Sequence, residues 1–261
     1  MTAAWARRVW VENLMGTTVS IHVIGTADDT TRDAVAASIE ELRDLERVFS
    51  PFLPDSDVSR IRRGEAAIAS ADPRIAQVAQ GCVEAAQATG GLFDAWWQGW
   101  FDPTGYVKGW AVDAVARRHL APLIRRPGIV AIGIGAGGDL RLHTAPGADW
   151  TWHIGIADPE RPGAVLATVD VREGAVATSG TAERGAHIVD PRTGAPATAV
   201  RSATVVAPDL VTADVWATAA VVAGDLGWIG RAPSTTGMLV RDDGSTRRWT
   251  RGVEISLAAA S

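Results

Sequence analysis

The sequence predicts an α+β fold in which the strands are mainly antiparallel. Short segments alternate apolar and polar residues, as at Val19, Ile21 and Val23, and this alternation is typical of a half-buried strand. Other segments carry apolar residues at spacings of three and four, which is typical of a helix packed on one face. Strands and helices do not alternate regularly along the chain, so a parallel βαβ sheet is not expected.

The N-terminal part is expected to begin with a strand or hairpin over residues 9–24. Met15 lies just before the alternating half of this segment. It either fills the core or packs against a flat ring, since its thioether side chain is flexible. Residues 28–49 repeat apolar side chains at threes and fours, which predicts a helix capped by Asp29 or Thr30.

A loop with two prolines separates this helix from the next ones. Phe52 lies between the prolines, so it either plugs the core or stacks on a ligand. Ser56 or Asp57 is expected to cap a short helix after the loop. Residues 72–89 again show helical spacing, and the glycines that follow end that helix.

Charged residues and glycines are closely spaced in the middle of the chain. Asp102, Lys108 and Asp113 could be simple surface charges, but the tight glycine spacing favours a functional role. Gly105 permits a close approach of the backbone. Lys108 is expected just before a helix that runs to about His119.

A glycine-rich turn follows the strand expected at residues 129–134. Residues 135–139 read GAGGD and superficially resemble a dinucleotide-binding loop. Residues 140–142 predict another strand where such a loop requires a helix, so a Rossmann fold is not expected. The remaining interpretation is a turn at which a ligand presses against the backbone.

The stretch 176–194 has the densest polar groups at the end of an expected strand. Small residues at 178–180 offer N–H groups that could face an anion. His187 and Asp190 follow, separated by two apolar residues. Because buried polar groups need partners, this stretch is either a ligand-binding rim or a structural turn in which His187 and Asp190 bond to loop amides.

The C-terminal part is expected to contain a helix and a final hairpin that turns at residues 243–244. The helix is expected to begin at Ala213, with Thr212 as its cap. Asp214 and Thr218 are four residues apart, so both lie on one face. A carboxylate and a hydroxyl near a helix start suit a hard cation such as Mg²⁺. The same residues could instead favour the helix dipole and bond back to the preceding turn.

Composition excludes several classes of protein. A net charge of −5 without a basic run argues against a nucleic-acid surface. The single cysteine, Cys82, excludes a disulfide framework and is expected to be an inert core residue. No apolar span is long enough for membrane insertion, and the first residues lack a signal core, so a cytoplasmic location is expected. The apolar content of 47% can supply the core of one domain over residues 1–261.

Taken together, these motifs resemble the ApbE-type FAD:protein FMN transferase family. The resemblance covers nearly the whole chain, in order. The matching segments are 15–17, 50–60, 91–94, 102–113, 137–139, 178–180, 187–194 and 213–218. Each motif is weak alone, but their order along the chain is specific. The resemblance implies a T-fold-like single domain.

The resemblance also implies an activity. Family members bind FAD and Mg²⁺, transfer FMN to a threonine hydroxyl of an acceptor protein and release AMP. His187 would activate the acceptor hydroxyl and Asp214 would be catalytic through the metal. The metal would be held at Gly105, Asp214, Ala217 and Thr218. Flavin or adenosine contacts would come from Met15, Phe52, Leu92, Phe93, Asp94, Asp102, Lys108 and Ile188.

Several departures from the family pattern keep two other functions open. Few residues separate Asp94 from Asp102, the aromatic usual after Ser179-Gly180 is replaced by Ala182, and Ala217 stands where some relatives carry an aspartate. The trimmed loops could expose the phosphates to water, which would make the protein an FAD pyrophosphatase giving FMN and AMP. The missing aspartate would suit a flavin-binding protein without catalysis.

Overall fold

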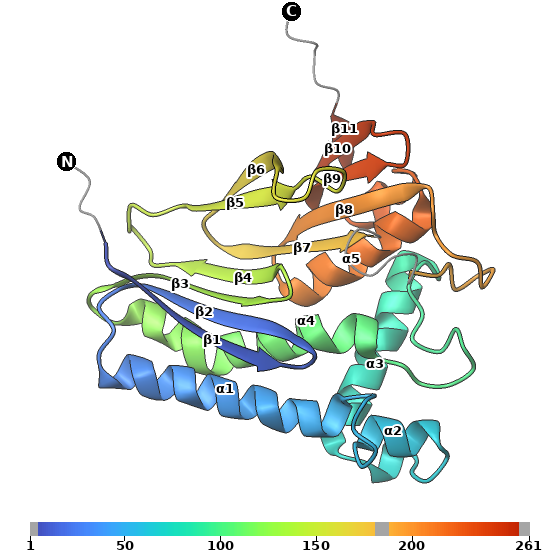
Figure 1. The fold of residues 1–261 in the computed structure, drawn as a ribbon, viewed down its shortest axis with the longest axis horizontal. Coiled ribbons are helices and arrows are strands. Elements are labelled where there is room, and N and C mark those ends of the chain that lie inside the picture. Colours follow the sequence, from blue (N-terminus) through green and yellow to red (C-terminus); the bar gives the residue numbers. More distant parts are fainter. Residues whose placement is uncertain (1–4, 181–187, 256–261) are drawn as a thin grey trace, which may run out of the picture.

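A computed structural model describes residues 5–180 and 188–255, and it has the expected α+β architecture (Figure 1). Within the described residues, nine strands form one sheet in the order β1-β2-β3-β4-β7-β8-β9-β10-β11, and β5 and β6 form a separate hairpin. Neighbouring strands among the described residues are antiparallel, both in the large sheet and in the hairpin. The strands are β1 Arg7–Leu14, β2 Thr17–Gly25, β3 Ile129–Ala136, β4 Asp139–Thr144, β5 Trp152–Ala157, β6 Val165–Val171, β7 Gly174–Gly180, β8 Val200–Ala207, β9 Thr236–Arg241, β10 Thr246–Thr250 and β11 Val253–Ile255.

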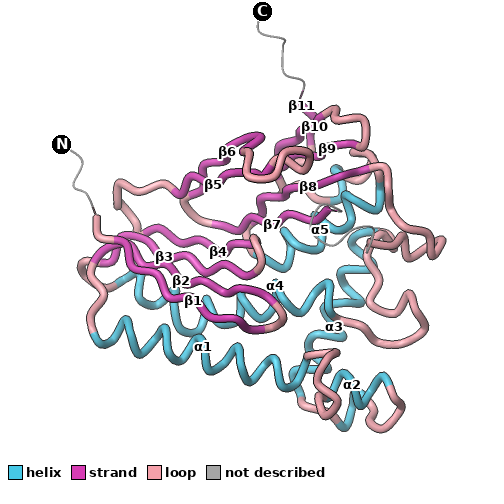
Figure 2. Tube along the Cα trace, viewed as in Figure 1, coloured by secondary structure: helices cyan, strands magenta, loops and turns pink. Residues whose placement is uncertain are grey.

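The helices gather on one face of the large sheet, and the β5–β6 hairpin lies toward the other face (Figures 1 and 2). They are α1 Asp29–Phe49, α2 Asp57–Arg62, α3 Pro73–Thr89, α4 Thr104–Val115 and α5 Leu210–Ala223, with short turns at Ile68–Ser70, Ala116–Leu120, Ala121–Arg125 and Ile229–Arg231. The helix α5 contacts β7, β8 and α4, while α1 contacts α4. The structure therefore has a helical layer, a sheet and a partial third layer.

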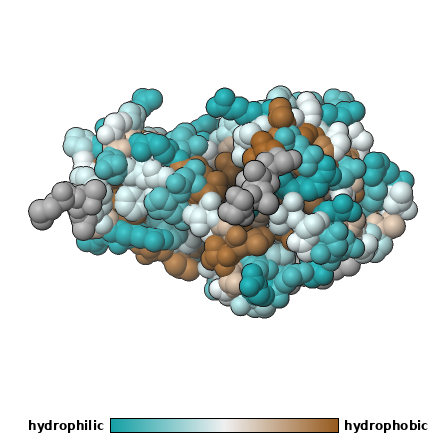
Figure 3. Space-filling view, turned by 90° about the horizontal axis from the view of Figure 1, so that it is seen from above, coloured by the Kyte–Doolittle hydropathy of each residue, from teal (hydrophilic) through white to brown (hydrophobic). Residues whose placement is uncertain are grey.

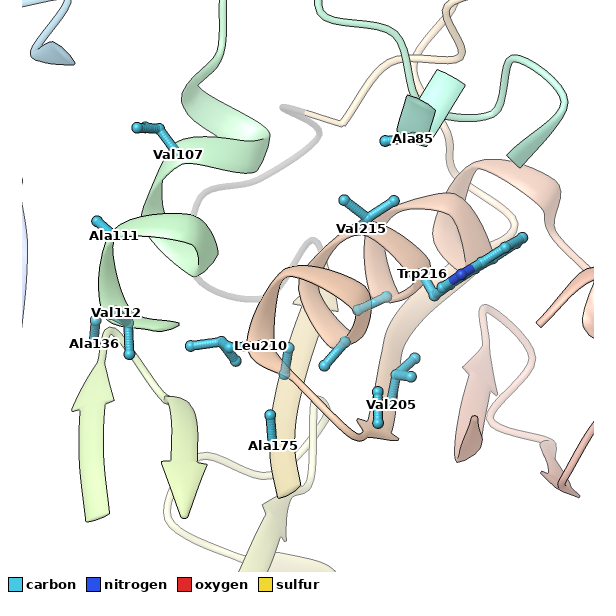
Figure 4. Close-up of a cluster of buried hydrophobic side chains, with 14 of the residues drawn as sticks. Ala85, Val107, Ala111, Val112, Ala136, Ala175, Val205, Leu210, Val215 and Trp216 are labelled. Atoms are coloured by element: carbon cyan, nitrogen blue, oxygen red, sulfur yellow. The ribbon is translucent and has the colours of Figure 1, made fainter. Parts of the chain in front are cut away.

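The core lies between the sheet and the helices, as the alternation in β2 predicts. Val19, Ile21 and Val23 are at most 2% exposed, and burial of such side chains stabilises the fold by roughly 1.5–3 kcal/mol each. The same layer contains Leu210 and Trp216 of α5 (Figure 4). Cys82 is fully buried there, as expected of a core residue.

The outer face of the sheet is covered less completely. Trp152 and Val171 of the hairpin pack on Leu142 and Val176 in a second, smaller apolar cluster. Val9 and Val11 of β1 remain 44% and 59% exposed. Seen from above, the surface mixes hydrophilic and apolar side chains, with apolar ones gathered near its middle (Figure 3).

The caps of two helices differ from those expected. The side chain of Asp28, rather than Asp29 or Thr30, caps α1 by accepting the Thr31 N–H. The helix α5 begins at Leu210 instead of Ala213, because Asp209 rather than Thr212 supplies the cap. In both cases an aspartate one or more residues upstream reaches a first-turn N–H group.

The helix α4 begins at Thr104, so Lys108 lies within it rather than before it. Glycines at 105 and 109 lower the intrinsic preference for a helix, but tertiary packing overrides this. Gly109 allows α4 and α5 to approach closely, since a Cβ there would lie 3.1 Å from the Leu210 carbonyl oxygen.

Candidate functional site

A cavity of about 520 Å³ lies where α4 and α5 meet the β3–β4 turn and the end of β7. Its wall combines segments far apart in the sequence, from Thr17 in β2 to Thr218 in α5. The loop after α3 contributes Phe93, and the loop after β5 contributes Asp158. The cavity is therefore a product of the tertiary fold rather than of one local motif.

One side of the cavity is apolar. Leu92, Phe93 and Ile188 line it and are at most 8% exposed. The Phe93 ring lies against the first turn of α4 because Gly105 has no side chain. A Cβ at Gly105 would come within 3.1 Å of that ring. This wall suits a flat, largely apolar ring system.

Two carboxylates flank the apolar wall, and the backbone holds each of them in place. Asp94 accepts the N–H of Trp96 at 2.8 Å. Asp102 accepts the N–H of Thr104 at 3.1 Å, at the start of α4. Both residues line the cavity, so their carboxylate oxygens are held at its wall by backbone N–H groups.

Another part of the cavity lining is charged. The Lys108 ammonium forms an ion pair with Asp139 Oδ2 and lies 3.7 Å from Asp214 Oδ2. Burial raises the pKa of Asp214 to about 7; the ammonium of Lys108 opposes this rise and the nearby Asp139 adds to it. Asp139 and Asp214 are 1% and 6% exposed, so both carboxylates are held in a medium of low polarity.

Thr218 lies one turn after Asp214 on α5, and both line the cavity. The Thr218 hydroxyl forms a hydrogen bond of 3.1 Å with the hydroxyl of Ser179 at the end of β7. Gly105 lines the cavity from α4. The helix spacing thus brings together the carboxylate and the hydroxyl that the sequence paired, with a backbone segment of α4 nearby.

A second set of contacts fixes α4, β4 and α5 relative to one another. Asp113 of α4 accepts the N–H groups of Leu210 and Val211 at 2.8 and 2.9 Å. Its other oxygen lies 3.4 Å from Arg141 Nε of β4. Asp113 is therefore a structural residue that orients α5, and its pKa is raised mainly because it is buried.

Some residues expected at the site lie elsewhere. Phe52 is 86% exposed, neither plugging the core nor lining the cavity, because its loop projects from the end of α1. Ala217 is fully buried on the core side of α5, since it is one residue out of phase with the cavity face. Met15 forms the β1–β2 turn with Gly16, and both have positive φ. His187 lies outside the described residues.

In the described segment 188–194, one polar residue has a structural role. Asp190 accepts the backbone N–H of Arg192 at 2.9 Å. Its carboxylate also forms an ion pair with the Arg192 guanidinium at 2.8 Å. This matches the alternative in which Asp190 satisfies loop amides. Ile188, Val189 and Pro191 of the same segment line the cavity.

The sequence did not reveal two parts of the cavity. The pairing of Lys108 with Asp139 joins residues far apart in the chain, although Asp139 follows the glycine turn noted above. Gly155, Asp158 and Pro159 of the β5–β6 hairpin also line the cavity. No local pattern in the hairpin indicates this contact. The turn at Gly137 and Gly138 joins β3 to β4, which confirms that it is not a dinucleotide loop.

Comparison with known proteins explains this arrangement. The sequence model described as the ApbE family matches residues 15–101 and 98–237. The chain belongs to the ApbE family. Among curated ApbE relatives, an FAD:protein FMN transferase of Klebsiella pneumoniae (strain 342) is 33% identical over 147 residues, which cover 52% of this chain and 38% of the relative. That of Escherichia coli (strain K12) is 33% identical over 127 residues, covering 45% and 35%.

The chain thus spans little more than a third of the length of the curated relatives it matches. Solved ApbE structures match over a greater length. The ApbE protein of Thermotoga maritima superimposes with a TM-score of 0.80 at 23% identity, covering 93% of this chain and 97% of the other. The flavin transferase ApbE of Vibrio cholerae gives 0.70 at 20% identity, covering 94% and 97%. These structures confirm the expected fold.

Within residues 5–180 and 188–255, no three His, Cys, Asp or Glu side chains cluster as a metal site. The helices of the same residues include none of the length and apolarity needed to cross a bilayer.

Proposed function

We propose that this chain transfers FMN from FAD to a threonine hydroxyl of an acceptor protein, with Mg²⁺, and releases AMP. The main support is that Asp214 and Thr218 face the same cavity as the apolar wall of Leu92 and Phe93. The cavity therefore joins a surface for a flat ring to a cluster of oxygen donors. The names of the curated relatives support the reaction class.

The donor set fits a hard divalent cation. Asp214 Oδ2 is buried and, among the described residues, makes no hydrogen bond of normal geometry. Thr218 supplies a neutral hydroxyl from the next turn, and the Gly105 carbonyl is proposed as a third oxygen. Magnesium prefers oxygen ligands of this kind. When bound, it would neutralise charge that develops on the phosphoryl oxygens.

The proposed residues have distinct tasks in the transfer. The threonine oxygen forms a bond to the FMN phosphorus, the P–O bond to AMP breaks, and the hydroxyl proton passes to a base, for which we propose His187. Leu92, Phe93 and Ile188 orient the flavin ring, while Asp94 and Asp102 accept its polar N–H or hydroxyl groups. Lys108 provides positive charge beside the pyrophosphate.

The test is to incubate the purified chain with FAD, Mg²⁺ and candidate acceptor proteins, including those encoded beside it. The expected result is flavin fluorescence that stays on the acceptor protein after denaturation. One AMP should be released for each FMN attached. Replacing the target threonine of that acceptor by valine should abolish the label.

The same assay distinguishes the alternatives. Release of FMN and AMP without an acceptor, and no labelled protein, would identify an FAD pyrophosphatase. Binding of FAD without either product would contradict any catalytic role.

A further inference from the structure

We propose that Asp139 is a positioning residue for the cation site. Its carboxylate holds the Lys108 ammonium beside β4 and so leaves Asp214 Oδ2 available to a divalent cation. The inference rests on the proposed function, because that function supplies the cation.

The contacts of Asp139 support a fixed position. The residue is 1% exposed and lies at the first position of β4, directly after the Gly137-Gly138 turn. Its Oδ1 accepts the N–H of Thr178 in β7 at 3.0 Å. Its Oδ2 forms the ion pair with Lys108. One oxygen is thus anchored to the sheet and the other binds the ammonium.

The Lys108 ammonium lies between two buried carboxylates, in close contact with one and 3.7 Å from the other. Two carboxylates and one ammonium leave a net negative charge, which attracts a divalent cation. Without the charge on Asp139, the ammonium and Asp214 would pair and neutralise each other. The cation would then have to displace Lys108 from Asp214.

The experiment measures binding of Mn²⁺ alone by calorimetry, with no FAD or acceptor. Asp139→Asn keeps the shape and the Oδ1 acceptor but removes the charge. We expect it to weaken Mn²⁺ binding on the order of tenfold or more. Lys108→Gln should leave binding unchanged or tighter. The surface variant Asp170→Asn is the matched control, because its ion pair with His153 is exposed.

The double variant Asp139→Asn/Lys108→Gln decides between positioning and mere structural support. It leaves Asp214 as a carboxylate without a competing ammonium, so Mn²⁺ binding should recover. A purely structural role for Asp139 would leave it weak, and that result would overturn the inference. Unchanged binding in folded Asp139→Asn would also overturn it.

Three further outcomes separate the inference from the proposed function. If Asp139→Asn does not fold, the Lys108→Gln variant still tests the inference, because weaker Mn²⁺ binding there would contradict it. A parent chain that binds Mn²⁺ but transfers no FMN refutes the proposed function alone. A parent chain that does not bind Mn²⁺ overturns the inference.

Discussion

The carboxylate of Asp113 on α4 accepts the backbone N–H of Leu210, the first residue of α5, at 2.8 Å. The same carboxylate accepts the N–H of Val211, and Asp209 accepts the N–H of Thr212. The first turn of α5 is therefore satisfied by side chains instead of water. Because Asp214 follows on the next turn, this contact sets where its carboxylate enters the cavity.

Replacing Asp113 with alanine should destabilise the protein. Two buried N–H groups would lose a charged acceptor, which we expect to lower the free energy of unfolding by about 2–4 kcal/mol. Urea denaturation measures this change. Asp170→Ala, which removes an exposed carboxylate, should change it by less than about 0.5 kcal/mol. Equal effects of both substitutions would contradict the anchoring role.

Gly109→Ala tests the close approach of α4 and α5. Alanine favours a helix by about 1 kcal/mol over glycine. Here its Cβ would lie 3.1 Å from the Leu210 oxygen and 3.2 Å from Val211 Cα, which are backbone atoms that cannot move independently. We expect a net loss of about 1–2 kcal/mol, seen as a lower thermal midpoint. Gly230→Ala is the control, since its Cβ would meet open space; a more stable Gly109→Ala variant would refute the argument.

Thr218→Val tests the oxygen donor on α5 while keeping the shape of the side chain. It removes the hydroxyl that bonds to Ser179 at 3.1 Å. We expect FMN transfer at limiting Mg²⁺ to fall on the order of tenfold or more, because a ligand oxygen is lost. Thr204→Val removes a similar hydroxyl pair, with Thr178 at 2.8 Å, and should retain most activity. Equal rates for both variants would argue against a ligand role for Thr218.

Arg74 should contribute stability that depends on pH. It donates to Asp44 of α1 at 2.6 Å and to Asp72, the cap of α3. Hydrogen bonds from Arg47 and Arg74 lower the pKa of Asp44, and that from Arg74 lowers the pKa of Asp72, from the usual 3.8. This stability is present above the unfolded pKa and is lost as pH falls through the lowered folded pKa.

Arg74→Ala should therefore be less stable than the parent by about 0.5–1 kcal/mol at neutral pH, because the pairs are partly exposed. The difference should shrink as pH falls below about 4 and through the lowered pKa values of Asp44 and Asp72. Chemical denaturation across this range measures it. A difference that stays constant with pH would show that the ion pairs contribute nothing to it.

The periodicity of apolar residues predicted the helices and strands in which one face is buried. The apolar spacing of α1 and α3 and the alternation of β2 gave elements within a few residues of those observed. The start of α4 was missed because Gly105 and Gly109 disfavour a helix in isolation. Burial of Val107 and Val112 stabilises it in the fold.

The site was predicted where its residues share a helix or a motif. The spacing of Asp214 and Thr218 places them on one face of α5, and both reach the cavity. The pairing of Lys108 with Asp139 depends on how α4 lies on β4, which no local pattern specifies. Phe52 was expected in the core or against a ligand, but its ring is exposed. Its position in a loop gave no information about the direction in which the ring points.

The cavity wall runs from Thr17 to Thr218, and this has a consequence for synthesis of the chain. A ribosome that has completed β8 has made every wall segment except α5, the helix that carries Asp214 and Thr218. An unfinished polypeptide therefore cannot assemble the cavity, and any ligand that binds only the complete cavity would stabilise these distant segments together.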